Sequence, residues 1–296
     1  MIDLHIHTKH SDGSDSPIEI LKKANELKLE ALSITDHNNV DSYLDFESIN
    51  VKELYKNRIV IGCEFTTSYN GRLIEILGYN FDYIKTHEYL KKYYNLESIN
   101  TYANTIYNRF IAKLNELNFT CSLPYVNNKQ FNTEFVEKKI YEELISHKEN
   151  VDRLDKELIS SYNIFLRKGL TNPNSIFYIN HASLKPPLEE ILNLIHSNGG
   201  IAFLAHPYQY GFEDIEATLT SLYTQYKIDG IECYHTTFNQ TQTDYLLNFA
   251  NKNNLLISGG SDYHGTNKLN HNLGIGNNNL NINKSILNNW ETLKNN

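Results

Sequence analysis

Side chains that can bind divalent metals recur along this chain in short groups. His5 and His7 stand two residues apart in IDLHIHT, and Asp36 and His37 are adjacent in SITDHN. Two histidines at this spacing on a strand point to the same face and can bind one ion. Imidazole with carboxylate is the ligand set typical of Zn, Mn or Fe(II), rather than of a thiolate-rich structural zinc site. The residue types therefore predict a metal centre.

Further candidate ligands follow the same pattern in both halves of the chain. They lie in or just after short apolar segments, and they are Asp12, Glu64, Glu75, His206, Glu232, Asp262 and His264. One such group alone is a weak signal, because most histidines only form hydrogen bonds and an acid after a strand often caps a helix. The recurrence at one predicted strand end after another favours a metal site over chance.

The segments that carry these residues alternate between strand and helix signals. Apolar, β-branched runs predict buried strands at 2–6, 31–35, 58–62 and 73–79, and GIAFLAH, KIDGIECY and LLISGG predict three more. Between the first two runs, Ser16, Pro17 and Glu19 form a helix start with a capping serine, an early proline and a glutamate three residues after the cap. This alternation predicts an α/β fold with a parallel sheet or barrel, whose functional residues lie where the strands end.

From residue 86 to residue 185 the pattern changes. Strand signals become rare, and helical spacing appears in patches such as Ile106 and Phe110. We therefore expect a discontinuous barrel, made of 1–85 and 186–296, and a mostly helical insertion at 86–185. An insertion that leaves the barrel between ligand-bearing strands is expected to overhang the metal site as a cap and to limit substrate size.

Composition and charge exclude some classes of protein. The chain is 40% hydrophobic and 21% charged, as ordinary globular proteins are, and its net charge of −8 argues against a broad nucleic-acid-binding face. A phosphorylated substrate remains compatible, because bound metals supply positive charge locally. Three scattered cysteines predict a reducing compartment. Since neither a signal-peptide pattern nor a membrane-length apolar run is present, we expect a cytoplasmic protein with no membrane partner.

Six motifs, in this order and at this spacing, resemble those of the polymerase and histidinol phosphatase (PHP) family: HIHTKHSDGS, SITDHN, GCEFTTSYNGRLIEILGY, GGIAFLAHP, GIECYH and GGSDYHG. The resemblance covers roughly residues 1–85 and 186–270. It implies a distorted seven-stranded (β/α) barrel with three divalent metal ions at the C-terminal mouth of the strands. The placement of the insertion resembles the subgroup that hydrolyses nucleoside 3′,5′-bisphosphates and trims short RNA from the 5′ end.

The resemblance also implies how the ligands are shared. The first metal would be bound by His5, His7, Glu64 and Asp262, the second by Glu64, His206 and Glu75, and the third by Asp12, His37 and His264. Glu64 would bridge the first two. Position 75 departs from the family pattern, because the subgroup usually has histidine there. An oxygen ligand at this position would shift the preference from Zn toward Mn, or the second metal would be weakly held.

Clustered metals of this kind predict phosphoester hydrolysis, in which two ions activate a shared hydroxide for attack on phosphorus. Asp262 and His264 can assist proton transfer, although both are expected mainly as ligands. His235 is the candidate for orienting the phosphate or protonating the leaving group, and a plain surface histidine is the alternative. Arg72 could bind a substrate phosphate through two nitrogens, or be only a turn residue in YNGR.

These features predict a metal-dependent phosphatase or phosphodiesterase with a small phosphorylated nucleotide or a short 5′-phosphorylated oligonucleotide as substrate. One alternative is a histidinol-phosphate phosphatase of the same family. Another is a non-catalytic metal-binding barrel, which the loss of several ligands would favour, whereas only position 75 departs from the pattern. The remaining histidines are not expected to bind metal: His10, His87, His147, His181, His196 and His271.

Overall fold

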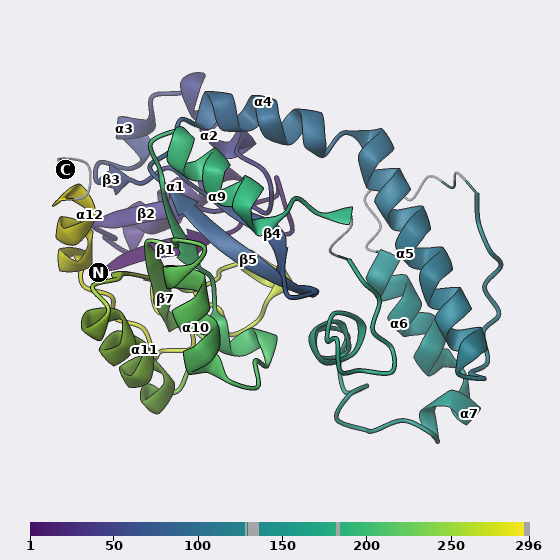
Figure 1. Cartoon of the computed structure of the whole chain (residues 1–296). Helices are drawn as coiled ribbons and strands as arrows, with labels where there is room; N and C mark the ends of the chain where they lie inside the picture. The colour runs from purple at the N-terminus through teal and green to yellow at the C-terminus, as the bar shows by residue number, and fades with distance from the viewer. Residues whose placement is uncertain (128, 130–135, 182–183, 293–296) are drawn as a thin grey trace.

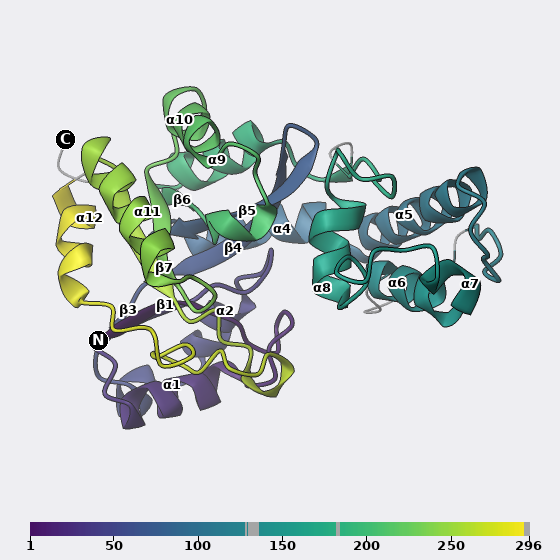
Figure 2. The same cartoon turned by 90° about the horizontal axis from the view of Figure 1, so that it is seen from below.

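The computed structural model describes residues 1–127, 129, 136–181 and 184–292. Strands wrapped by helices carry the candidate ligands, and a separate group of helices extends to one side of them (Figures 1 and 2). In the described ranges, no helix is both long and apolar enough to cross a membrane.

The strands of the described chain form two sheets. The first is parallel, in the order β1 (Ile2–Ile6), β2 (Ala31–Ile34), β3 (Arg58–Ile59). The second has the order β4 (Gly62–Tyr69), β5 (Arg72–Tyr79), β6 (Ile201–Leu204), β7 (Gly230–His235), β8 (Leu256–Gly260). The sheets meet where Ile6 bridges Tyr263, and again where His37 bridges Glu64. The predicted α/β class is confirmed, and the closed seven-stranded barrel stays a prediction.

The expectation of a parallel sheet is wrong for β4 and β5, which form an antiparallel hairpin, and β5 also pairs antiparallel with β6. Asn70 and Gly71 join the two strands of the hairpin, and their φ angles of 48° and 77° are both positive. Positive φ at both central residues defines the tight turn that Asn-Gly favours in two-residue hairpins. The chain reverses direction at YNGR. The strand predicted at 58–62 is shorter than expected, because β3 covers only Arg58–Ile59 and β4 begins at Gly62.

Helices pack around the sheets as the sequence predicts. They are α1 (Pro17–Glu26), α2 (Asp41–Glu47), α3 (Val51–Leu54), α9 (Leu188–Ser197), α10 (Ile215–Thr224), α11 (Gln240–Lys252) and α12 (Asn288–Thr292), with short 3₁₀ turns at Pro207–Tyr210, Gly265–Asn267 and Lys284–Leu287. The capping box of α1 forms as predicted, because Ser16 and Glu19 bind each other's backbone N–H groups. The buried face of α1 packs into the same hydrophobic cluster as Ile6 and Leu32.

The remaining helices lie in the middle of the chain. They are α4 (Tyr83–Tyr93), α5 (Leu96–Glu116), α6 (Val136–Ser146), α7 (Lys148–Val151), α8 (Tyr162–Ile164) and the π-helix η1 (Phe165–Leu170). From α5 onward they have a hydrophobic cluster of their own, in which Phe165 packs against Phe110 and Phe177. The domain boundaries stay a prediction.

The tip of the β4–β5 hairpin joins these helices to the sheets. The Tyr178 hydroxyl donates to the Gly71 carbonyl at 2.7 Å, and Thr67 donates to the Pro186 carbonyl at 2.8 Å. Arg72 donates to Asn172 Oδ1 and to the Tyr210 carbonyl, each at 2.8 Å. The hairpin therefore carries both a candidate ligand, Glu75, and the attachment of the helical segment.

Candidate metal centre

The predicted ligands converge from the ends of β1, β2, β6 and β8 and the loops that follow them, and from Glu64 near the start of β4 and Glu75 within β5. Three overlapping groups have potential ligand atoms within 4.8 Å of one another: His5, His7 and Glu64; His37, Glu64 and Glu75; and His7, Asp12, His37 and His264. His206 and Asp262 lie beside these groups, as the distances below show. The structure thus brings together all nine residues predicted as ligands.

The first group is built on the two-residue period of β1. His5 and His7 are completely buried, and their Nε2 atoms are 3.1 Å apart. Glu64 Oε2 lies 3.3 Å from both of these nitrogens, and Asp262 Oδ1 lies 3.6 Å and 3.4 Å from them. Two imidazoles and two carboxylates that approach a common point are the arrangement expected of ligands to one cation.

A buried carboxylate behind His5 orients its ring. Glu232 Oε1 is 2.8 Å from His5 Nδ1, and Glu232 Oε2 accepts the backbone N–H of His206 at 2.6 Å. Because Nδ1 is engaged with Glu232, Nε2 of His5 is directed to the centre. Glu232 therefore belongs to the shell of groups that orients ligands and raises their basicity, although its position in the sequence also made it a candidate ligand.

A second group contains His206 and Glu75. His206 Nε2 lies 2.9 Å from Glu64 Oε1 and 3.3 Å from Glu75 Oε2. His37 Nδ1 lies 3.1 Å from Glu64 Oε2 and 3.9 Å from Glu75 Oε1. One oxygen of Glu64 thus faces His206 and the other faces the first group, which is the geometry of a carboxylate that bridges two cations.

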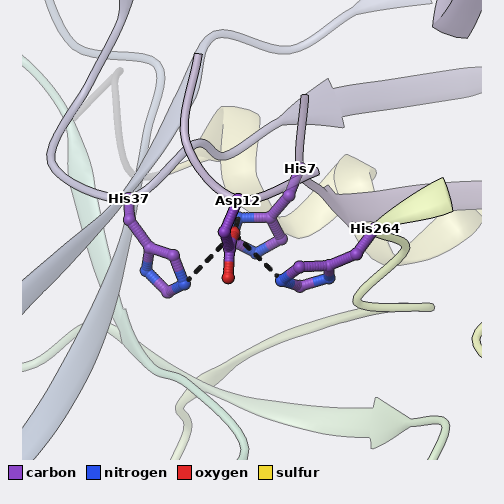
Figure 3. A group of neighbouring side chains, drawn as sticks. All are labelled: His7, Asp12, His37 and His264. Atoms are coloured by element: carbon purple, nitrogen blue, oxygen red, sulfur yellow. Dashed lines mark ion pairs between the residues drawn. The ribbon is translucent and has the colours of Figure 1, made fainter. Parts of the chain in front are cut away.

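A third group surrounds Asp12 (Figure 3). Asp12 Oδ1 is buried, forms no well-directed hydrogen bond, and lies 3.1 Å from His264 Nε2, 3.6 Å from His7 Nδ1 and 3.8 Å from His37 Nε2. His264 Nδ1 is held at 2.8 Å by the Asp262 carbonyl, so that its Nε2 is turned toward Asp12. A buried carboxylate oxygen among three imidazole nitrogens fits a metal ligand better than an ordinary hydrogen-bond acceptor.

The charges in this cluster depend on one another. Burial alone would raise the pKa of Glu64, but the imidazoles of His5 and His37 hold it well below its ordinary value. Burial would likewise lower the pKa of His7, yet the carboxylates of Asp262 and Glu64 raise it to about 10. Divalent cations would replace these protons as the partners of the carboxylates, so the donor set fits such ions and their binding would release protons.

Two of the predicted ligands have an unusual backbone conformation. The φ angle is 24° at His206 and 54° at Asp262. Positive φ is uncommon for residues other than glycine, and such strain concentrates at sites where the surrounding structure enforces it for function. Each lies two residues after the end of a strand, His206 after β6 and Asp262 after β8, and its side chain is part of the cluster.

Two cations at the centre escaped the sequence analysis. Arg167, in the π-helix η1, places Nη2 3.5 Å from Glu75 Oε2. Lys268 places Nζ 2.5 Å from Asp262 Oδ2. Neither residue lies at a strand end or in a recognised motif, and Arg167 comes from the predicted insertion. The only sequence signal was for Lys268, which follows the SDYHG motif by three residues.

His235 lies beside the centre. It is buried at the end of β7, its Nε2 is 3.3 Å from Asp262 Oδ2, and its Nδ1 is 2.9 Å from the Thr237 hydroxyl. Burial lowers the pKa of this imidazole, so the neutral ring is favoured. The alternative of a surface histidine does not hold, while the predicted catalytic role stays a prediction.

Arg72 lies at the start of β5. Its guanidinium is engaged with Tyr210 and Asn172, as described above, so that two of its nitrogens already have partners within the protein. Phosphate binding by Arg72 stays a prediction, and the contacts that the structure shows are those of a tether.

Most histidines that were set aside pair with acids away from the centre: His10 with Asp45, His87 with Asp41, His147 with Glu143 and His196 with Asp229. His271 is closer to the centre than its sequence context indicates, because its Nδ1 is 3.7 Å from Asp262 Oδ2. The same Nδ1 atom lies 3.1 Å from the carbonyl oxygen of Ser261. Because a carbonyl oxygen can only accept, His271 Nδ1 is the donor in this hydrogen bond. His271 Nδ1 therefore carries a proton and is not a free ligand atom.

The sequence is similar to a known domain family and to curated proteins. A model of the PHP domain matches residues 3–254. The 5′-3′ exoribonuclease of Haemophilus influenzae is 26% identical over 267 residues, which cover 88% of this chain and 89% of that protein. The 5′-3′ exoribonuclease Rnm of Escherichia coli is 25% identical over 270 residues, with 88% and 84% covered.

Solved structures share the fold. A protein from Bifidobacterium adolescentis described as a metal-dependent phosphoesterase superposes with a TM-score of 0.61 at 19% identity, covering 97% of this chain and 94% of that one. An amidohydrolase from Chromobacterium violaceum has a TM-score of 0.63 at 20% identity, covering 90% and 88%. The family model matches most of this chain, so the chain belongs to the PHP family. It is an enzyme that hydrolyses phosphoester bonds.

Proposed function

We propose that the protein hydrolyses a phosphoester of a nucleotide, either a nucleoside 3′,5′-bisphosphate or the 5′ end of a short oligonucleotide. The observation that carries this proposal is the position of Glu64, whose two oxygens face imidazoles on opposite sides, His206 on one and His5 and His7 on the other. A bridging carboxylate implies more than one cation, and clustered cations suit displacement at phosphorus.

The ligand sets remain those inferred from the family motifs. His5, His7, Glu64 and Asp262 would hold one ion; Glu64, Glu75 and His206 a second; and Asp12, His37 and His264 a third. Manganese, iron and zinc all suit these nitrogen and oxygen donors. When bound, such ions supply an activated water and neutralise charge on the phosphate.

The chain contributes its own cations to the same site. Arg167 contacts Glu75, and Lys268 contacts Asp262. Burial would lower the pKa of Lys268, but Asp262 raises it above its ordinary value, and the charge of Arg167 opposes that rise. Two like charges near each other at the centre would both be stabilised by a phosphate between them. We therefore assign Arg167 and Lys268 to phosphate binding and to the stabilisation of charge that develops during displacement.

His235 is assigned to orientation of the phosphate or protonation of the leaving group. Its neutral imidazole is held by Thr237 on one side and by Asp262 on the other. A ring held at both nitrogens keeps a defined direction, which a proton donor at a fixed site needs.

The nucleotide substrate is supported by the names of the similar proteins, which are 5′-3′ exoribonucleases matched over most of their length. The helical segment supports it too, because η1 brings Arg167 to the centre from outside the sheets. A segment in this position can act as a cap that limits the size of the substrate.

The test is phosphate release by manganese-loaded protein from adenosine 3′,5′-bisphosphate, AMP, histidinol phosphate, a short 5′-phosphorylated RNA and p-nitrophenyl phosphate, with nucleotide products followed in parallel. Preference for the bisphosphate or the RNA is expected. Release from histidinol phosphate with none from the bisphosphate would establish the histidinol-phosphate alternative. Bound metal without cleavage of any ester would favour the non-catalytic alternative.

A further inference from the structure

Lys185 lies near the metal centre and has no anionic partner at ion-pair distance among the residues that the structure describes. Lys185 lies over the ring of Tyr102, with its Nζ 4.0 Å from the ring centroid, and 5.8 Å from the ring centroid of Tyr94. Within the described residues, no carboxylate forms an ion pair with this ammonium group. A partly buried charge whose only close partners are aromatic faces can still bind an anion.

Two acids, Glu137 and Glu75, act on Lys185 from farther away. Burial lowers the pKa of Lys185, and the charges of Glu137 and Glu75 oppose that shift. Glu137 accepts the Tyr102 hydroxyl at 2.6 Å, and Glu75 pairs with Arg167 at 3.5 Å. Among the described residues, neither acid forms an ion pair with Lys185 at close range.

A second donor beside Lys185 is also unused. The hydroxyl oxygen of Tyr94 is buried, and it has no hydrogen-bond partner in the described part of the chain. Buried polar atoms are nearly always hydrogen-bonded, so an unpaired one calls for a ligand, ion or water. The Tyr94 hydroxyl and the Lys185 ammonium, which lies 5.8 Å from the Tyr94 ring centroid, are two donors of the kind that suits a phosphate group.

The position of this pair adjoins the centre. Thr67 of β4 donates to the carbonyl of Pro186, the residue after Lys185, and Ser68 bridges Pro187. Thr66, the neighbour of Thr67, is the register partner of Glu75 across the hairpin. The chain at Lys185 therefore runs along the strand that carries Glu64 and that pairs with the strand of Glu75.

There is room for a nucleoside next to these donors. A cavity of about 570 Å³ is lined by Tyr93, Tyr102 and Leu184, and also by the charged side chains of Lys92, Glu97 and Glu190. Tyr94 and Lys185 do not line it themselves but are the chain neighbours of Tyr93 and Leu184. This volume lies in the range of small-ligand sites, and aromatic side chains suit the face of a base.

We propose that Lys185 and Tyr94 form a second anion site, which binds a phosphate group of the substrate other than the one that is hydrolysed. The site selects substrates with two phosphates separated by a nucleoside, as in a bisphosphate nucleotide or an oligonucleotide. This inference rests on the proposed function, because it names the class of nucleotide that the same centre accepts.

The experiment compares wild type with Lys185→Gln and with a matched control, Lys91→Gln, at an exposed lysine near the end of α4. The ratio of kcat/KM for adenosine 3′,5′-bisphosphate to kcat/KM for p-nitrophenyl phosphate is measured in each. Loss of one charge-assisted contact should lower this ratio roughly 10- to 100-fold in Lys185→Gln and leave it unchanged in Lys91→Gln. An unchanged ratio in Lys185→Gln would overturn the proposal.

Two further measurements separate the possible failures. Tyr94→Phe removes only the hydroxyl, so it should lower the same ratio about threefold or more even if Lys185→Gln does not fold. Binding of adenosine 3′,5′-bisphosphate and AMP, followed by calorimetry without turnover, tests the anion site if the wild type cleaves no ester. In that case weaker bisphosphate binding in Lys185→Gln than in Lys91→Gln supports the site, and equal binding refutes it.

Discussion

Glu75, like Asp262, is a proposed ligand that a cation of the protein already faces. Its Oε2 lies 3.3 Å from His206 Nε2 and 3.5 Å from Arg167 Nη2. A glutamate at a position where the resemblance to the family implies a histidine adds one negative charge to the centre, and Arg167 offsets that charge. The two residues should therefore be treated as a pair, since removing either leaves the other without its partner.

Glu75→His tests the identity of the second ligand. We expect the variant to retain activity and to shift its metal preference from manganese toward zinc, because imidazole is the softer ligand. Metal content by mass spectrometry and kcat/KM with each metal measure the shift, and Glu26→His on the exposed side of α1 is the matched control. Complete inactivity with metal still bound would give Glu75 a role other than that of a ligand.

Glu232→Gln tests the orientation of His5. The amide removes the charge that favours a proton on His5 Nδ1 and directs Nε2 to the centre, so metal affinity should fall about 10- to 100-fold. His7→Ala removes a direct ligand and should weaken metal binding further, with loss of activity and a retained fold. Titration with Mn²⁺ and circular dichroism measure both effects. Affinity equal to wild type in Glu232→Gln would mean that His5 is oriented by other contacts.

At the scale of the elements, the carboxylate of Asp229, just before β7, connects α9 with β6. Asp229 Oδ2 accepts from His196 Nε2 at 2.8 Å and from the backbone N–H of Ala202 at 2.7 Å. His196 lies in the last turn of α9, where a positive charge is also favourable to the helix dipole. The hydrogen bond to Asp229 raises the pKa of this half-buried imidazole.

This junction predicts a pH dependence of stability. Because the folded-state pKa of His196 is raised, its stabilising effect is complete below the unfolded-state pKa of about 6.5 and disappears as the pH rises through the folded-state value. Urea unfolding of wild type and His196→Gln should thus differ most near pH 5 and converge at alkaline pH. A difference that grows with rising pH would contradict this assignment. The effect should be modest, because the pair is partly exposed.

Two short elements place charge at the centre. The Asn70–Gly71 turn folds β4 back against β5 and so puts Glu75 opposite Thr66, two residues from Glu64. The π-helix η1 presents Arg167 to Glu75 from the other side. Single π-helical turns often occur at functional sites, because the wider turn redirects a side chain.

At the scale of the whole molecule, acidic composition and metal binding are linked. The chain carries a net charge of −8, and several buried carboxylates gather at one end of the strands. With no cation bound, these acids are compensated mainly by imidazolium groups and by Arg167 and Lys268. Bound divalent ions would add positive charge where it is most needed.

Metal removal should therefore destabilise the whole fold. A ligand that binds only the native state at 100 times its Kd stabilises it by about 2.7 kcal/mol, which corresponds to a rise in Tm of roughly 4 °C for a chain of this size. Thermal unfolding with manganese and with a chelator measures the difference. His7→Ala should show a much smaller response, and an equal response in both proteins would place the stabilising ion elsewhere.

Sequence patterns alone predicted the features that depend on near neighbours. The two-residue period of a strand sets His5 and His7 on one face, and Ser16 with Glu19 caps α1. The order of the motifs predicted the family. The Asn-Gly turn was also readable, and the error about β4 and β5 came from giving more weight to strand and helix alternation than to turn chemistry.

Tertiary structure decided the features that depend on distant segments. Arg167 contacts Glu75, which lies 92 positions earlier in the sequence. Lys185 lies beside the rings of Tyr94 and Tyr102, which are 91 and 83 positions earlier. Metal-ligand residue types reveal themselves by their kind and spacing, because few other roles use them together. A single arginine, lysine or tyrosine gives no such signal, since its role is set by the side chains that packing brings around it.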